Sequence, residues 1–121
     1  LAIEYFVKGD EVYFNEMAPR PHNSGHWTIE GSTTNQFREL CRYLLDMPLE
    51  EPQLKAPTVM KNILGQDLER AEALARENRP GVYVHIYGKT GSKPKRKMGH
   101  VTFVGVTGEE YAAKWADRFV K

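Results

Sequence analysis

The alternation of hydrophobic and polar positions near the N-terminus predicts a β-hairpin. Two β-prone runs, residues 2–7 and residues 12–14, flank the dipeptide Gly9-Asp10. Such a dipeptide between two strand-like runs is typical of a tight hairpin turn. Glu4 and Glu16 lie near the ends of the two runs that are far from this turn. We therefore expect two carboxylates close to each other at the open end of a hairpin.

The register of this hairpin has two interpretations. A two-residue turn at Gly9-Asp10 pairs Glu4 with Asn15 and places Glu16 on the other face, because side chains alternate along a strand. A three-residue loop or a bulge places Glu4 opposite Glu16. Turn chemistry favours the first interpretation, since glycine suits the first position of a type II′ turn. A shared metal ion favours the second, and the sequence leaves both open.

A helix is predicted to start at residues 32–36. Thr33 as N-cap with Gln36 three residues later matches a capping box, and the helix is expected to end before Pro48. Apolar residues recur along it with the spacing of one buried helical face, at Phe37, Leu40, Cys41, Leu44 and Leu45. We expect Cys41, the single cysteine, to be a buried, unreactive thiol in a reducing compartment.

The next segment predicts a strand followed by a helix. Residues 58–64 are rich in Val, Met and Ile, which indicates a strand, and Gly65 ends it. Asp67 is placed to cap a helix over residues 68–78. The residues of this helix are good helix formers, but its apolar face is thin. We therefore expect it to pack only lightly.

Two further strands, at residues 82–87 and 98–106, are predicted on either side of a basic loop. His85 alternates with apolar neighbours, which favours a structural histidine. Thr107 and Glu110 form a capping box that opens a final helix, and its aromatic spacing indicates core packing. The aromatic residues are Tyr111, Trp115 and Phe119. These elements together predict an α+β fold, with helices packed on a mostly antiparallel sheet.

Composition narrows the classes of function. The chain has 121 residues, 40% hydrophobic and 27% charged, with a net charge of +1. These values are ordinary for a globular protein with a modest core. No apolar run approaches the roughly 20 residues that span a bilayer, and no signal peptide is visible. We expect a cytoplasmic protein that does not bind membranes.

The loop over residues 89–97 is rich in lysine and arginine and contains no acidic residue. It is typical either of a solvated hairpin tip or of a clamp for a phosphate dianion. The run has no interleaved aromatic residue, and the chain has no basic excess. We therefore expect no nucleic-acid partner.

The polar residues that follow the hairpin are typical of a metal and phosphate site. Two carboxylates, Glu4 and Glu16, repel each other unless a cation lies between them, and Mg²⁺ prefers oxygen ligands, phosphate oxygens included. Asn15 offers an amide oxygen, and Arg20 offers a planar fork for an anion. His22 can exchange a proton near neutral pH. The pattern favours a metal site joined to an anion pocket.

A run of fourteen residues resembles the signature of the 5-(carboxyamino)imidazole ribonucleotide synthase family. It reads Asn15-Glu16-Met17-Ala18-Pro19-Arg20-Pro21-His22-Asn23-Ser24-Gly25-His26-Trp27-Thr28. The family comprises ATP-grasp ligases of purine biosynthesis, the ATPase subunits of phosphoribosylaminoimidazole carboxylase. The resemblance continues in order through Asn35-Gln36-Phe37, Leu45-Asp46-Met47-Pro48-Leu49, Asn62-Ile63-Leu64-Gly65, Tyr87-Gly88-Lys89 and Arg96-Lys97-Met98-Gly99-His100.

The resemblance implies a C-terminal fragment of such a ligase. Residues 1–50 would be the end of the ATP-grasp domain, and residues 51–121 the small C-terminal domain. The N-terminal and central domains would precede Leu1, so the chain alone would be inactive and its hairpin unusually exposed. The full-length protein would be a homodimer. It would use ATP and Mg²⁺ to carboxylate 5-aminoimidazole ribonucleotide with bicarbonate.

The resemblance also implies roles for single residues. Glu4 and Glu16 would hold Mg²⁺, and Asn15 with Glu16 would line the ATP site. Arg20, His22 and Lys89 would be catalytic, with Arg20 and His22 orienting bicarbonate or carboxyphosphate. The substrate-binding residues would be Asn23, Ser24, Lys89, Arg96 and Lys97, of which the last three would bind the ribonucleotide phosphate.

Two other functions are compatible with the sequence. One is a different ATP-grasp enzyme, such as the formate-dependent glycinamide ribonucleotide transformylase, although the segment 23–27 argues against it. The other is a non-catalytic module that binds phosphate or RNA, which a steep salt dependence of binding would support.

Overall fold

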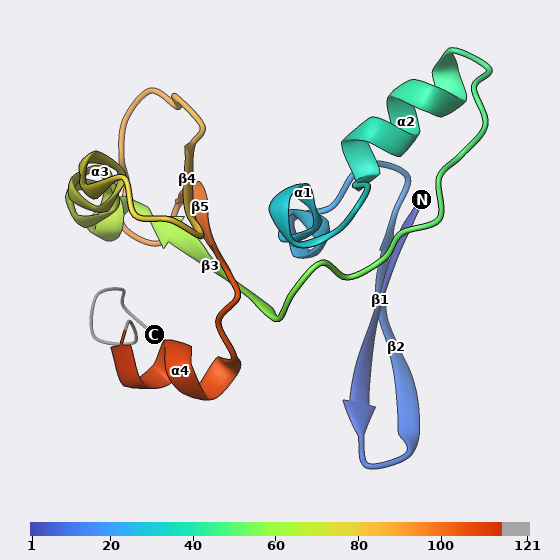
Figure 1. Ribbon diagram of the computed structural model, residues 1–121, viewed down its shortest axis with the longest axis horizontal. Coiled ribbons are helices and arrows are strands. Elements are labelled where there is room, and N and C mark those ends of the chain that lie inside the picture. Colours follow the sequence, from blue (N-terminus) through green and yellow to red (C-terminus); the bar gives the residue numbers. More distant parts are fainter. Residues whose placement is uncertain (115–121) are drawn as a thin grey trace.

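A two-stranded hairpin and a three-stranded sheet, each with its own helices, divide the chain into two halves (Figure 1). The computed structural model describes residues 1–114. The hairpin consists of β1 (Ala2–Lys8) and β2 (Glu11–Ala18). The sheet has the order β3-β5-β4, with both pairings antiparallel. This arrangement confirms the predicted α+β class.

The hairpin combines features of both expected registers. Gly9 has a φ of 61°, which suits the first position of a type II′ turn, and Lys8 pairs with Glu11 across it. The register then shifts between Tyr5 and Glu4, so that Tyr5 pairs with Phe14 but Glu4 pairs with Glu16. Asn15 is the extra residue of a β-bulge. The bulge reconciles a two-residue turn with paired glutamates.

Three helices follow the hairpin: η1 (Asn23–Gly25), α1 (Thr28–Gly31) and α2 (Gln36–Leu44). The predicted capping box at Thr33 is wrong, because the N-cap of α2 is Asn35, whose side chain accepts from the N–H groups of Phe37 and Arg38. The Thr33 hydroxyl instead accepts from the N–H of Gln53. The helix does end before Pro48, as predicted.

The apolar face of α2 is exposed, contrary to the prediction. Leu44 and Leu45 are 71% and 70% exposed, and Cys41 is an exposed free thiol. The spacing correctly indicates an amphipathic helix, but within residues 1–114 this face is contacted at its N-terminal end, where the Phe37 ring lies 5.3 Å from the His26 ring, and is left open at its C-terminal end. Side chains of the hairpin, such as Phe6 and Phe14, are similarly exposed. The expectation of an exposed hairpin is therefore confirmed.

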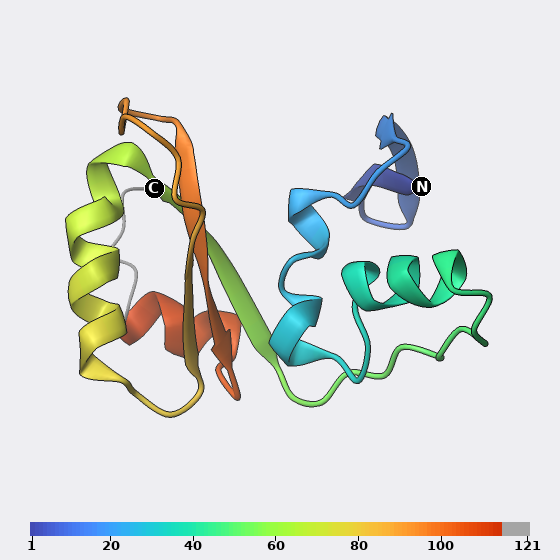
Figure 2. The ribbon, with the colours of Figure 1, turned by 90° about the horizontal axis from the view of Figure 1, so that it is seen from above.

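Figure 2 shows α3 (Leu68–Glu77) along one face of the three-stranded sheet, and the hydrophobic core lies between them. The strands are β3 (Thr58–Leu64), β4 (Val82–Ile86) and β5 (Lys97–Val104), and η2 (Gly65–Asp67) leads into α3. The fully buried core side chains are Ile63, Ala71, Leu74, Val101 and Phe103. The prediction that α3 packs lightly is therefore wrong, because its two buried residues, Ala71 and Leu74, pack directly against the sheet.

The last described helix, α4 (Gly108–Lys114), begins with the predicted capping box. The Glu110 carboxylate accepts from the N–H of Thr107, and the Thr107 hydroxyl accepts from the N–H of Glu110. The Tyr111 ring lies 5.3 Å from the Phe103 ring, which confirms its packing on the core. Trp115 and Phe119 lie outside the described residues. Among the described helices, none is long and apolar enough to cross a membrane.

Phe103→Ala tests this assignment of the core. Removal of a fully buried phenylalanine should lower the free energy of unfolding by about 3–5 kcal/mol, since the ring leaves a cavity between the sheet and α3. The matched control Phe6→Ala removes an exposed ring and should change it by about 0.5 kcal/mol or less. Urea unfolding followed by circular dichroism measures both. Equal effects would contradict the position of the core.

Candidate active site

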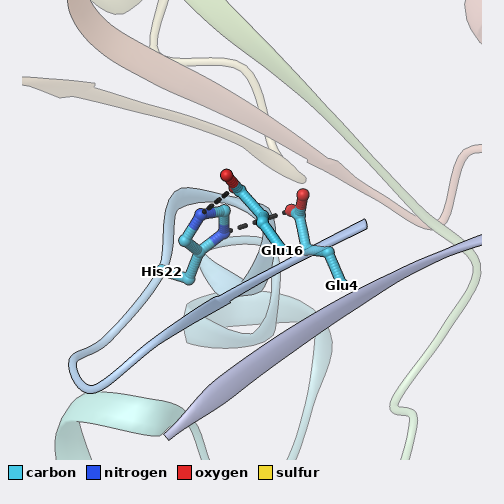
Figure 3. Close-up of side chains that lie close together, drawn as sticks. All are labelled: Glu4, Glu16 and His22. Atoms are coloured by element: carbon cyan, nitrogen blue, oxygen red, sulfur yellow. Dashed lines mark ion pairs between the residues drawn. The ribbon is translucent and has the colours of Figure 1, made fainter. Parts of the chain in front are cut away.

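Three side chains converge at the open end of the hairpin. Glu4 on β1 and Glu16 on β2 flank the imidazole of His22, which lies on the loop after the hairpin (Figure 3). The ring Nδ1 is 3.1 Å from Glu4 Oε1, and Nε2 is 2.9 Å from Glu16 Oε1. His22 is only 15% exposed, whereas Glu16 is 55% exposed. The site is therefore held from one side and open to solvent on the other.

Local hydrogen bonds hold this arrangement in place. His22 has extended backbone angles and is the N-cap of η1, so its ring lies back over Ser24, with Nδ1 2.8 Å from Ser24 Oγ. The Asn15 amide donates to Glu4 Oε2 at 3.2 Å, which the bulge permits. The side chain of Ser24, the charge of His22 and the Asn15 amide all lower the pKa of Glu4. Glu4 is therefore an anion at neutral pH.

The donor set fits a divalent cation. One ligand atom from each of Glu4, Glu16 and His22 lies within 4.8 Å of the others. Carboxylate oxygens are the ligands that Mg²⁺ prefers, and the ion commonly adds phosphate oxygens and water. The two glutamates predicted as metal ligands are thus brought together.

The basic loop of the second half reaches the same region. Lys97 Nζ donates to Asn23 Oδ1 at 3.1 Å, across 74 residues of sequence. Lys89 Nζ donates to the carbonyl of Lys97 at 2.8 Å and lies 5.3 Å from the centre of the Tyr87 ring. Asn23, Lys89 and Lys97 therefore form one polar cluster, beside the loop that carries His22.

The two predicted arginines make other contacts. The Arg20 guanidinium donates to the carbonyl of Pro21 at 3.1 Å and lines a groove against α2. The Arg96 guanidinium donates to the carbonyls of Thr90 and Gly91, at 2.8 and 2.9 Å, and so closes its own loop. Neither group is hydrogen-bonded to the three converging side chains.

Histidine rings join the two halves. His85 stacks on His100 with centroids 4.4 Å apart, and His26 lies 5.1 Å from His100 on the N-terminal side. His85 Nε2 is also 2.7 Å from Glu30 Oε1, which confirms the prediction of a structural histidine. The strand pairing is close here, since a Cβ on Gly99 would lie 2.1 Å from the carbonyl oxygen of His85.

His100 is the most deeply buried of these rings. It is 2% exposed, its Nδ1 is 2.8 Å from the Tyr87 hydroxyl, and its Nε2 is buried without a protein hydrogen-bond partner among the described residues. Burial, followed by the positive potential of His85 and His26, lowers the pKa of His100 to about 4. The ring is therefore neutral at physiological pH.

Two residues that lie beside the site, Tyr87 and Gln36, were not predicted from the sequence to have a role in it. Tyr87 contributes its ring beneath Lys89 and its hydroxyl to His100. Gln36 bonds to the backbone of His22 rather than capping α2. The Tyr87–His100 and Gln36–His22 contacts are not local in sequence, so no spacing pattern could reveal them. The only available signal was their position within the segments that resemble the ligase family.

Comparison with known proteins defines the class to which these two halves belong. Residues 1–37 match the ATP-grasp domain model, and residues 58–114 match the phosphoribosylaminoimidazole carboxylase C-terminal domain model. N5-carboxyaminoimidazole ribonucleotide synthase of Aquifex aeolicus is 43% identical over 113 residues, which are 93% of this chain and 31% of the relative.

Solved structures agree with this class. N5-carboxyaminoimidazole synthetase from Staphylococcus aureus complexed with ADP has a TM-score of 0.85 and 37% identity, covering 98% of this chain and 32% of that chain. The Aspergillus clavatus synthase, in complex with ADP and 5-aminoimidazole ribonucleotide, has a TM-score of 0.79 and 34% identity, with coverage of 93% and 32%.

The matched domains make this an ATP-grasp protein in its N-terminal part. The chain belongs to the N5-carboxyaminoimidazole ribonucleotide synthase family, and it spans about a third of the length of the curated relatives that it matches.

His100 should make stability depend on pH. The unfolded chain binds a proton at this histidine below about pH 6.5, whereas the folded chain does so only near pH 4. Stability should therefore fall as the pH drops through this window, and His100→Gln should reduce that fall. Some pH dependence of stability should remain in this variant, because burial also lowers the pKa of His26.

The measurement is the free energy of unfolding in urea, determined at several pH values between about 7 and about 4. The quantity compared between the two proteins is the change of the unfolding free energy with pH. This comparison separates the titration of His100 from any overall destabilisation by the substitution. An unchanged pH dependence in His100→Gln would contradict the assignment.

Proposed function

We propose that this chain is the C-terminal third of an ATP-dependent ligase that carboxylates 5-aminoimidazole ribonucleotide with bicarbonate in purine biosynthesis. The main observation behind the proposal is that two groups of residues, one from each half of the chain, lie on segments that contact each other. The Glu4, Glu16 and His22 constellation comes from the ATP-grasp part, and the Lys89 and Lys97 cations come from the C-terminal domain. ADP and 5-aminoimidazole ribonucleotide in the related Aspergillus clavatus structure support this assignment.

The open end of the hairpin would bind ATP and its magnesium ion. Glu4 and Glu16 would hold Mg²⁺, and Asn15 with Glu16 would line the nucleotide site. When bound, Mg²⁺ neutralises phosphate charge and so assists phosphoryl transfer to bicarbonate. The hydrogen bonds from Asn15 and Ser24 keep Glu4 ionised and oriented for this task.

The loop after the hairpin would bind the carboxyl group that is transferred. His22 would position bicarbonate or carboxyphosphate and move a proton, with Arg20 binding the anion. Asn23 and Ser24 would complete this pocket, since both lie within the same short loop as His22. Positioning and charge neutralisation are the two effects on which such transfers depend.

The basic loop would bind the ribonucleotide phosphate through Lys89, Arg96 and Lys97. Lys89, which donates to the carbonyl of Lys97, would lie nearest to the reacting groups, and Lys97 contacts Asn23. Arg96 would exchange its contacts with Thr90 and Gly91 for the phosphate. Cations that share one dianion gain more from charge-assisted hydrogen bonds than from neutral carbonyl partners.

The domain organisation and setting belong to the same proposal. Residues 1–50 would end the ATP-grasp domain and residues 51–121 would form the small C-terminal domain of a cytoplasmic homodimer. The names of the relatives favour the carboxylating ligase over a formate-dependent transformylase. A trial of both substrates with the full-length protein distinguishes these two enzymes.

The isolated chain should not turn over. It carries the proposed metal and phosphate ends, but catalysis requires the complete site. The full-length protein that contains this chain should hydrolyse ATP only when 5-aminoimidazole ribonucleotide and bicarbonate are both present. Robust hydrolysis by the isolated 121-residue chain would contradict the fragment assignment. An inactive full-length protein would contradict the proposed reaction.

Three substitutions in the full-length protein should separate the two ends of the site. Glu16→Ala should mainly weaken the use of magnesium and ATP. Arg96→Ala should raise the KM for 5-aminoimidazole ribonucleotide about 10- to 100-fold, because a charge-assisted phosphate contact is lost. His22→Ala should lower kcat by about 100-fold, because this side chain lies beside the reacting carboxyl group.

Steady-state kinetics with each substrate varied in turn measures these effects. Thr90→Ala is a matched control for Arg96→Ala, since Thr90 accepts from Arg96 only through its main chain. A change in the ATP constant alone for Arg96→Ala, or full turnover in His22→Ala, would show that the residue roles are wrong.

A further inference from the structure

Gln36 makes a two-sided contact with the backbone of His22. Its Oε1 accepts from the N–H of His22 at 2.7 Å, and its Nε2 donates to the carbonyl of His22 at 2.7 Å. A side-chain amide thus pairs with both main-chain polar groups of one residue, as a neighbouring strand would. Because Gln36 is the first residue of α2, this contact ties the His22 loop to a helix.

The chemistry of the contact fixes the orientation of the amide. Exchange of its oxygen and nitrogen would set a donor against the N–H of His22 and an acceptor against its carbonyl. The second proton of Nε2 points to His26 Nδ1 at 3.0 Å. His26 Nδ1 is then an acceptor, which agrees with the lowering of the His26 pKa by burial.

Close packing holds the amide in place. A Cβ added to Gly25 would lie 3.1 Å from Cδ, Nε2 and Oε1 of Gln36, so the loop backbone rests directly on this side chain. The His26 ring lies between the Phe37 ring, at 5.3 Å, and the His100 ring, at 5.1 Å. Gln36 therefore connects the His22 loop both to α2 and to the histidines of the sheet.

We propose that Gln36 is a positioning residue for the ligase reaction, a role that rests on the proposed function. It acts through His22 by fixing the backbone of this residue, so that the imidazole lies between Glu4 and Glu16. His22 follows Pro21 in an irregular segment, and the first helical turn after it is the short η1. The His22 carbonyl also accepts from the N–H of Gly25 at 3.0 Å, so η1 and the Gln36 amide hold this backbone together, and the Gln36 amide is the partner of the His22 N–H.

The test uses the full-length protein and the variant Gln36→Leu, which keeps the size of the side chain and removes all three hydrogen bonds. We expect kcat to fall about tenfold, while the KM values for ATP and for 5-aminoimidazole ribonucleotide stay within about twofold. In His22→Ala, the further change Gln36→Leu should lower kcat by less than about twofold, because the residue on which Gln36 acts has already lost its ring.

Gln53→Leu is the matched control, since exposed Gln53 takes part in the hydrogen-bond network through its main chain. It should leave kcat unchanged. If Gln36→Leu fails to fold by circular dichroism, Gln36→Glu carries the test, because it keeps the acceptor for the His22 N–H but loses the donor. This variant should lower kcat by a smaller factor with the same KM values.

Four results would overturn the proposal. They are an unchanged kcat in Gln36→Leu, an additive loss of kcat in the double variant, a change in KM alone, and an equal loss of kcat in Gln53→Leu. Failure of the underlying function is distinguishable, because the unsubstituted full-length protein would then be inactive. An active parent with an unaffected Gln36→Leu would remove only the role of Gln36.

Discussion

Two carboxylates on paired strands repel each other, and the site exists because the surrounding structure compensates this repulsion. Glu4 and Glu16 are cross-strand partners, with the His22 ring between them. Like charges directly opposite each other on a sheet are destabilising, unless a donor or a cation lies between them. The Ser24 and Asn15 side chains supply further donors to Glu4.

The joint between the halves relies on polar and aromatic contacts rather than on a shared apolar core. The core lies on the helix-covered face of the sheet, whereas His26, His85 and His100 stack on the other face. His85, at one end of this stack, lies within hydrogen-bond distance of Glu30 on α1. Lys97, which begins β5, reaches Asn23 across the same joint. The relative placement of the carboxylate cluster and the basic loop therefore depends on directional contacts, which tolerate less sliding than apolar packing.

Local chemistry was predicted from the sequence more accurately than tertiary contacts. The strand at residues 58–64, the Thr107 capping box and the tight turn at Gly9-Asp10 all follow from short-range patterns, and all occur, whereas the sequence left open the bulge that pairs Glu4 with Glu16. Burial was predicted less well, because periodicity shows that a helix is amphipathic without showing what covers it. Cys41 is exposed for this reason. The contacts of Arg20, Arg96 and Gln36 depend on loop geometry, which residue types alone do not determine.

The bulge at Asn15 increases the number of functional groups that one strand offers to one site. A regular strand presents a side chain to the same face only every second residue, or about every 6.6 Å. Here the consecutive residues Asn15 and Glu16 both lie against Glu4, one through its amide and one as its cross-strand partner. Two adjacent positions therefore serve a single site beside Glu4, at the cost of one unpaired step in the ladder. A strand without this irregularity would need a second segment of the chain to supply the same density of polar groups.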